Sequence, residues 1–226
     1  MTNSTSLEFK CPDCGNKQEI QYWDSLDVSV DGEMRDKFLK NEINFYNCAK
    51  CGLFIPLDLG MVYHDAERKY MIYFENFKSN DKIKDKFNSL SDSLKDDEMK
   101  KIVKEGYRLR IVLSRFHAQE KIRILDAGLD DMQVEIFKIN LRYFMEREKG
   151  IKALAVMFKG YDEINSDTMQ FNVYDENEEA HLFSTSFAKQ YSEIKKQYAQ
   201  KLKESQKADP QWLIVDGNYV LEKFIK

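Results

Sequence analysis

The chain has 226 residues, 42% of them hydrophobic, which is enough to bury a core and excludes disorder throughout. No segment approaches the roughly 18 uninterrupted apolar residues of a membrane helix, and the start is polar, so we expect neither a membrane protein nor an exported one. The formal net charge is −4, and this whole excess lies in residues 1–78, where nine Lys and Arg face thirteen Asp and Glu. An acidic half of this kind is poorly suited to bind a phosphate backbone, so nucleic acid is an unlikely partner for it.

All four cysteines occur in two pairs of the form Cys-x-x-Cys-Gly, Cys11 with Cys14 and Cys48 with Cys51. Two residues between thiols let one tight turn direct both sulfurs at one ion, and the following glycine lets the backbone fold under it. Four thiolates complete a tetrahedral shell at about 2.3 Å per bond and leave no position for substrate. The pattern therefore predicts a structural zinc ion bound by Cys11, Cys14, Cys48 and Cys51.

Other uses of these thiols stay open. Iron is the substitute metal for a four-thiolate site, two redox-active dithiols are a second alternative, and oxidation that releases the metal is a regulatory variant. Cysteine use confined to such pairs suits a reducing compartment, so we expect a cytoplasmic protein.

The spacer between the pairs, residues 15–47, is longer than the roughly 15–20 residues of a simple zinc ribbon. Alternating apolar residues from Ile20 to Val30 predict a strand, the spacing of Met34, Phe38 and Leu39 predicts a helix, and alternation resumes at Ile43. Residues 53–57, 61–64 and 70–74 follow as extended segments. We expect a small mixed sheet that the zinc ion closes at one end.

The remainder of the chain mixes helices and strands. Residues 79–98 predict a helical connector or a linker, and the basic segment 100–110 is helix-like. Asp130 and Gln133 resemble a capping box for a helix that ends at Gly150. Strands are predicted at 153–158, 169–174, 181–183 and 212–215, with a short final element at 219–225. One helix with an apolar stripe precedes Pro210, and its stripe consists of Phe187, Tyr191, Ile194, Tyr198 and Leu202.

The predicted fold class is α+β. Residues 1–78 form a zinc-ribbon-like domain with an inserted helix, residues 79–98 connect it, and residues 99–226 form an α+β domain.

The two cysteine pairs, their long spacer and the stretch Met61-Val62-Tyr63-His64-Asp65 before an aromatic-rich strand resemble the CpXC family of small bacterial proteins. The resemblance covers about residues 8–76, and residues 120–131 are also similar to longer members. The second pair lacks the proline of the first but keeps both thiols and Gly52. The family has no assigned activity, so the resemblance implies the metal and the fold and leaves the function open.

Outside the cysteines, no residue has a clear chemical role. The three histidines, His64, His117 and His181, are scattered and are predicted to be ordinary core or surface residues. His64 has the strongest claim to function because Asp65 follows it and could orient a neighbouring imidazole, although we favour a role for both in shaping the turn. The basic segment 100–110 could touch nucleic acid or an acidic partner, but a solvated charged surface is favoured.

Aromatic residues are frequent before residue 78. We expect about half to fill a core and the others to cap a groove or meet a second protein, and we favour the protein contact. These aromatic residues are Phe45, Tyr46, Phe54, Tyr63, Tyr70, Tyr73, Phe74 and Phe77. No phosphate-binding loop, His-Glu-x-x-His or Gly-x-Ser-x-Gly motif occurs.

The leading hypothesis is a non-catalytic zinc-binding protein that acts through protein contacts, with its oligomeric state left open. The alternatives are a transcription-linked nucleic-acid-binding protein and an enzyme with a pocket between the two parts.

Overall fold

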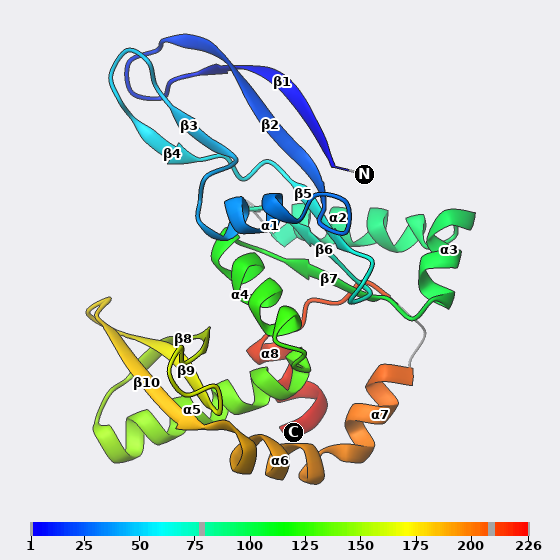
Figure 1. The fold of residues 1–226 in the computed structure, drawn as a ribbon, viewed down its shortest axis with the longest axis vertical. Helices are drawn as coiled ribbons and strands as arrows, with labels where there is room; N and C mark the ends of the chain where they lie inside the picture. The colour runs from blue at the N-terminus through cyan, green and yellow to red at the C-terminus, as the bar shows by residue number, and fades with distance from the viewer. Residues whose placement is uncertain (1, 77–79, 208–210, 226) are drawn as a thin grey trace. The chain divides into compact units, whose positions relative to one another are not determined.

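A computed structural model of the chain describes residues 2–76, 80–207 and 211–225. The chain divides into two compact units, Met1–Gln119 with Pro210–Leu213, and Glu120–Asp209 with Ile214–Lys226. The first contains the cysteine pairs and the larger sheet, and the second contains a further α+β arrangement (Figure 1). The α+β class predicted from the sequence is therefore confirmed.

The first unit contains a five-stranded mixed sheet in the order β1-β2-β5-β6-β7. A long antiparallel hairpin, β1 paired with β2, forms one side, and β5 runs parallel to the last residues of β2. Strand β6 is antiparallel to β5, and β7 is parallel to β6. The strands are β1 (Asn3–Lys10), β2 (Lys17–Asp27), β5 (Met61–Asp65), β6 (Tyr70–Phe74) and β7 (Arg108–Val112).

The predicted strand–helix–strand spacer is present as β2, helix α1 (Gly32–Leu39) and β3 (Phe45–Asn47). Strand β3 pairs with β4 (Phe54–Pro56) in a separate two-stranded sheet. The prediction that the first strand reaches Val30 was wrong, because β2 ends at Asp27. The Asp27 carbonyl accepts bonds from the Val30 and Asp31 amides, so the chain turns there toward α1 and leaves Val30 80% exposed.

The segment before β7 is helical, as expected for a connector, and comprises α2 (Asn80–Ser93) and α3 (Asp97–Lys104). The helix-like interpretation of residues 100–110 was wrong in its second half, because Arg108 begins strand β7. Gly106 lies just past the end of α3 with φ +84°, a conformation that ends helices. Pairing with β6 and burial of Leu109 and Ile111 then favour the strand. Independent folding of residues 1–78 and 99–226 stays a prediction.

Arg115, at the start of helix α4 (Arg115–Asp126), fixes the loops around β3 and β4. Its guanidinium lies 2.9 Å from Asp58 Oδ1 and donates to the carbonyl oxygens of Ile43 at 3.3 Å and Asn44 at 3.0 Å. It also lies 4.7 Å from the centre of the Phe45 ring. This buried cation, 5% exposed, therefore anchors the sheet that carries the second cysteine pair.

In the second unit, helix α5 (Asp131–Lys149) packs against β8 (Ala153–Tyr161) of an antiparallel sheet in the order β10-β9-β8. The other strands are β9 (Thr168–Asp175) and β10 (Ala180–Ser186). Half of the predicted capping box is present, because Asp130 Oδ1 accepts from the Gln133 amide at 3.1 Å, whereas the Asp130 amide donates to the Tyr191 hydroxyl at 2.9 Å. Gly150 ends the helix with φ +65°, as predicted.

The predicted long helix before Pro210 consists of two helices, α6 (Phe187–Gln197) and α7 (Ala199–Lys207), separated at Tyr198. Within its predicted stripe, Ile194 and Leu202 are buried. Pro210, predicted to end this helix, and Phe77, named among the aromatic residues, lie outside the described residues, as does the side chain of Phe187.

The strand predicted at 212–215 was wrong. Leu213 makes one isolated bridge to Arg110, with its backbone bonded to Leu109 and Ile111. Pairing stops there because Asp216 already caps the next helix, accepting from the Tyr219 amide at 2.9 Å. The chain continues as α8 (Gly217–Val220) and the π-helix η1 (Leu221–Ile225).

Candidate metal centre

The two cysteine pairs lie in equivalent turns, one between β1 and β2 and the other between β3 and β4. In each turn the amide of the final glycine donates to the carbonyl of the first cysteine, Gly15 to Cys11 at 3.0 Å and Gly52 to Cys48 at 2.9 Å. Gly15 has φ +71° and Gly52 has φ +75°, which side-chain-bearing residues adopt at a cost. Both turns therefore have the conformation expected of a zinc knuckle.

The structure brings all four predicted ligands together. Cys11 Sγ lies 3.7 Å from Cys51 Sγ, Cys14 Sγ lies 3.6 Å from Cys48 Sγ, and all four sulfurs lie within 4.8 Å of one another. A regular tetrahedron with metal–sulfur bonds of about 2.3 Å has edges of about 3.8 Å. All four cysteines are free thiols. Their spacing can hold one metal ion.

A small apolar cluster supports the sulfurs. Cys11 and Cys48 are 1% and 2% exposed and pack with Tyr22, Tyr46 and Leu57. The Phe9 ring lies 4.6 Å from the Tyr46 ring. This cluster keeps water away from two of the four thiols, whereas Cys51 is exposed.

The thiols differ in acidity. A hydrogen bond with Tyr46 lowers the pKa of Cys48 to about 5. The Leu53 amide favours the Cys51 thiolate, but desolvation and the neighbouring thiols outweigh it and raise the pKa of Cys51 to about 12. A cation bound among the four sulfurs would favour the ionised form of each thiol.

Gln18 links the two knuckles and was not singled out from the sequence. From β2, its Nε2 donates to the Asn47 carbonyl at 2.8 Å, and its Oε1 accepts from the Ala49 amide at 3.0 Å. The same oxygen accepts from Asn16 Nδ2 at 3.3 Å. In sequence Gln18 is one more polar residue on an alternating strand, so no signal separates it from solvent-facing neighbours.

His64 does not pair with Asp65, which was the alternative that we did not favour. Successive residues of β5 face opposite sides of the sheet. His64 Nδ1 instead lies 3.3 Å from Asp27 Oδ2, and His64 Nε2 lies 3.2 Å from the Tyr107 hydroxyl. Asp65 accepts from the Arg68 amide at 2.9 Å and shapes the turn before β6, as the favoured interpretation held.

The other two histidines lie in separate local contacts. His117 Nδ1 lies 3.0 Å from Ser114 Oγ at the start of α4. His181 Nε2 lies 2.8 Å from Asp175 Oδ2, and Asp175 Oδ1 accepts from the amides of Asn177 and Glu179. These bonds hold the β9–β10 turn. Among the described residues, no histidine joins the cysteine cluster.

A buried ionic network in the second unit was also missed. Lys138 Nζ lies 2.9 Å from both Glu120 and Glu135, and Glu120 Oε1 accepts from the Phe158 amide at 2.6 Å. Burial alone would lower the pKa of Lys138, but Glu120 and Glu135 raise it and keep the amine charged. The network joins α4, α5 and β8, and it has a structural explanation without any ligand.

Of the eight predicted aromatic residues, most fill the core of the first unit. Buried are Tyr46, Tyr63, Tyr70, Tyr73 and Phe74. Phe54 is 58% exposed and stacks on Phe45 with ring centres 4.8 Å apart. Part of the expected exposed surplus therefore lies on the sheet that carries Cys48 and Cys51.

The model of one protein family, described as CpXC protein, matches residues 9–138. No curated protein and no solved structure matches the chain. The family match includes both knuckles, strand β7, helix α4 and the first part of α5. Within the described residues, no helix has both the length and the apolar character needed to cross a membrane.

Proposed function

The chain belongs to the CpXC family, and from that premise we propose that it is a non-catalytic cytoplasmic protein that binds one structural zinc ion and acts through contacts with another protein. The sulfur spacing is the observation that carries the zinc assignment, because 3.6 and 3.7 Å approach the edge of a four-thiolate zinc site. Four protein ligands leave no coordination position for water or substrate, which favours a structural ion over a catalytic one. Soft thiolates also disfavour magnesium and calcium.

Elemental analysis of the purified full chain tests the metal. We expect one zinc per chain, and loss of that zinc in a Cys11→Ser, Cys48→Ser double variant. Less than half an equivalent of zinc after purification in metal-free buffers would contradict the proposal. Visible absorption from bound iron would assign the site to the other metal that four thiolates accept.

Exposed apolar residues beside the second knuckle support the protein contact. Phe54 is 58% exposed and Leu59 is 53% exposed, and both lie close in sequence to Cys51. Large apolar side chains grouped on a surface commonly mark contact sites. The acidic excess of residues 1–78 supports a protein partner over a nucleic acid.

A matched pair of surface variants tests the contact. Phe54→Glu removes the exposed ring, and Ile164→Glu places the same charge at a 99% exposed site in the second unit. We expect affinity capture from native lysate to recover a partner with the wild type and with Ile164→Glu but not with Phe54→Glu. Equal recovery with both variants would exclude this surface, and salt-sensitive recovery of nucleic acid alone would overturn the partner class.

A further inference from the structure

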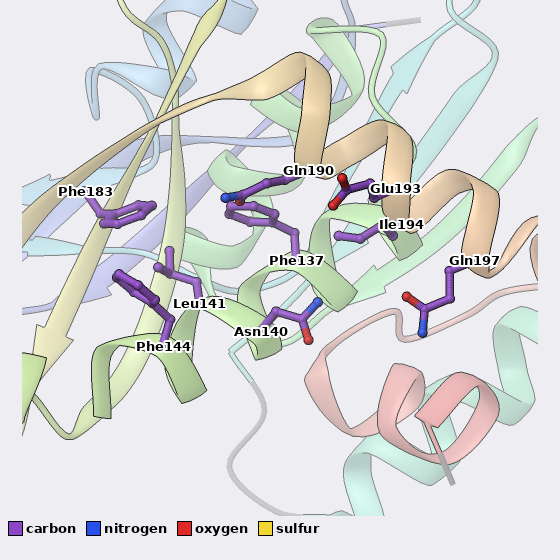
Figure 2. Close-up of a pocket in the computed structure, with 9 residues that line it drawn as sticks. All are labelled: Phe137, Asn140, Leu141, Phe144, Phe183, Gln190, Glu193, Ile194 and Gln197. Atoms are coloured by element: carbon purple, nitrogen blue, oxygen red, sulfur yellow. The ribbon is translucent and has the colours of Figure 1, made fainter. Parts of the chain in front are cut away.

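A pocket of about 360 Å³ lies in the second unit between helices α5 and α6 and strand β10 (Figure 2). This volume falls within the range of small-molecule sites, about 300–1,000 Å³. Its lining residues are Phe137, Asn140, Leu141, Phe144, Phe183, Gln190, Glu193, Ile194 and Gln197. The zinc proposal assigns no role to this pocket.

The floor and one end of the pocket are apolar. Phe137, Leu141 and Ile194 are buried, at 3%, 3% and 5% exposure. Leu141, Phe144 and Phe183 gather at the left end of Figure 2, where the rings of Phe144 and Phe183 meet edge to face at 5.8 Å. Phe144 is nevertheless 41% exposed, so an entering apolar group would cover surface that now faces water.

The other end is polar and acidic. Glu193 and Gln197 extend from α6 toward the right of Figure 2 and Asn140 adds an amide group from α5, and all three residues are exposed. Gln190 lies beside Phe137, nearer the apolar end. Glu193 is the one charged residue among those that line the pocket, and among the described residues it has no ion-pair partner. The single carboxylate at this end favours a cation over an anion.

We propose that this pocket binds small organic amines that carry an aromatic or branched apolar group. The apolar group lies against Leu141, Phe144 and Phe183, and the ammonium group lies toward Glu193, where side-chain amide oxygens also accept hydrogen bonds. The size of the pocket, its two-ended polarity and the single carboxylate together select this class.

Three probes that differ only in their end group test the class, each added to the full zinc-loaded chain. They are 4-phenylbutylamine, 4-phenylbutan-1-ol and 4-phenylbutyrate, with binding followed by ligand-observed NMR and chemical-shift titration. We expect the amine to bind with a Kd of about 1 mM, the alcohol several-fold more weakly, and the carboxylate not at all. Equal binding of amine and carboxylate, or no saturable binding of the amine below about 10 mM, would overturn the proposal.

Variants with matched controls locate the site. Glu193→Gln should weaken binding of the amine about 3-fold and leave binding of the alcohol unchanged. Glu148→Gln, on the exposed surface of α5, should change the binding of neither probe. Phe144→Ala should weaken binding of the amine and of the alcohol alike, by about 5-fold. Its control is Tyr143→Ala, at a neighbouring residue that is 60% exposed.

Asn140→Trp blocks the pocket from its exposed rim and should abolish binding of every probe. Circular dichroism checks whether this variant folds. If it does not fold, Glu193→Gln and Phe144→Ala decide the question. Amine binding that survives both Glu193→Gln and Phe144→Ala unchanged would place the site elsewhere and refute the assignment.

Discussion

The knuckle end of the first unit and the α5 region of the second unit both contain side chains that are costly to bury in charged form: thiols in the first, and a lysine with two glutamates in the second. At the knuckle end, four thiols converge, and two of their cysteines, Cys11 and Cys48, belong to a cluster of five buried residues. Around α5, Lys138 lies between Glu120 and Glu135, and eleven residues of the helix are buried. The four sulfurs of the first arrangement can hold a cation from outside the chain, whereas the two carboxylates of the second lie against a lysine of the same chain.

This difference predicts that loss of a single cysteine is the largest effect. In Cys14→Ser or Cys48→Ala, the remaining thiols cannot complete a four-ligand site, and metal binding provides much of the folding free energy of small metal-bound regions. We expect rapid proteolysis around residues 8–57, while α5 and the β8–β10 sheet keep their protection. Limited proteolysis with mass spectrometry measures this, and treatment of the wild type with a chelator should reproduce it.

Uniform loss of protection, including residues 131–175, would contradict the comparison. It would show that the chain unfolds as one cooperative unit in which the knuckles stabilise both parts.

The next effect concerns the internal charges. Lys138→Met removes the cation that lies 2.9 Å from both Glu120 and Glu135, and removing one partner of a buried ion pair typically costs about 3–5 kcal/mol. We expect the second unit of this variant to unfold at clearly lower urea concentration, whereas Lys149→Met at the exposed end of α5 should have little effect. Urea titration followed by circular dichroism measures both variants.

A triple variant sharpens this result. Glu120→Gln, Glu135→Gln and Lys138→Met together remove all three charges, and the side-chain amide oxygen introduced by Glu120→Gln can still accept from the Phe158 amide. Recovery of most of the lost stability would show that the cost came from unpaired charge. A triple variant as unstable as the single one would assign the cost to packing instead.

Local patterns in the sequence predicted the features that depend on residues close together in the chain. The four ligands, the Asp130 cap and the Gly150 end of α5 each follow from the preference of a few adjacent residues. What failed or was missed depends on residues far apart in the chain. The strand character of β7 comes from pairing with β6, and Arg115 finds its partners about 57 to 72 residues away.

The same distinction, between features set by nearby residues and features set by distant ones, explains which functional residues the sequence did not reveal. Gln18 and the pocket lining have ordinary spacings on their own elements, and only the fold brings them to the second knuckle or to one another. The His64–Asp27 contact is of the same kind, since β2 and β5 are separated by the whole second knuckle. The exposed fraction of Phe54 was likewise beyond the sequence, because alternation does not say which face is buried.

A smaller effect is expected from Gln18, which joins the two knuckles without binding the metal. Gln18→Ala removes hydrogen bonds to Asn47 and Ala49. A hydrogen bond of this kind typically contributes about 1 kcal/mol to stability. We expect the protein to fold and keep zinc but to release it several-fold faster to a chelator. The control is Gln21→Ala on the same strand as Gln18, which removes an exposed bond to Ser4 of β1. Equal release rates in both variants would show that the metal alone sets the geometry of the knuckles.

The smallest effect is a local pH dependence in the second unit, far in sequence from any cysteine. The hydrogen bond from His181 and those from the amides of Glu179 and Asn177 lower the pKa of Asp175 below its usual value. A depressed carboxyl pKa means that the fold favours the ionised form, so its contribution is complete above the unfolded pKa of about 3.9 and fades as the pH falls through the folded value. We therefore expect the amides of Asn177 and Glu179 to stay protected from hydrogen exchange down to about pH 4 and to lose that protection below it.

A variant and a matched control test this assignment. Asp175→Asn should show weaker protection at neutral pH and no loss on acidification, whereas Asp167→Asn, on an exposed turn of the same unit, should behave like the wild type. An acid-induced loss of protection in Asp175→Asn equal to that of the wild type would assign the titration to another group.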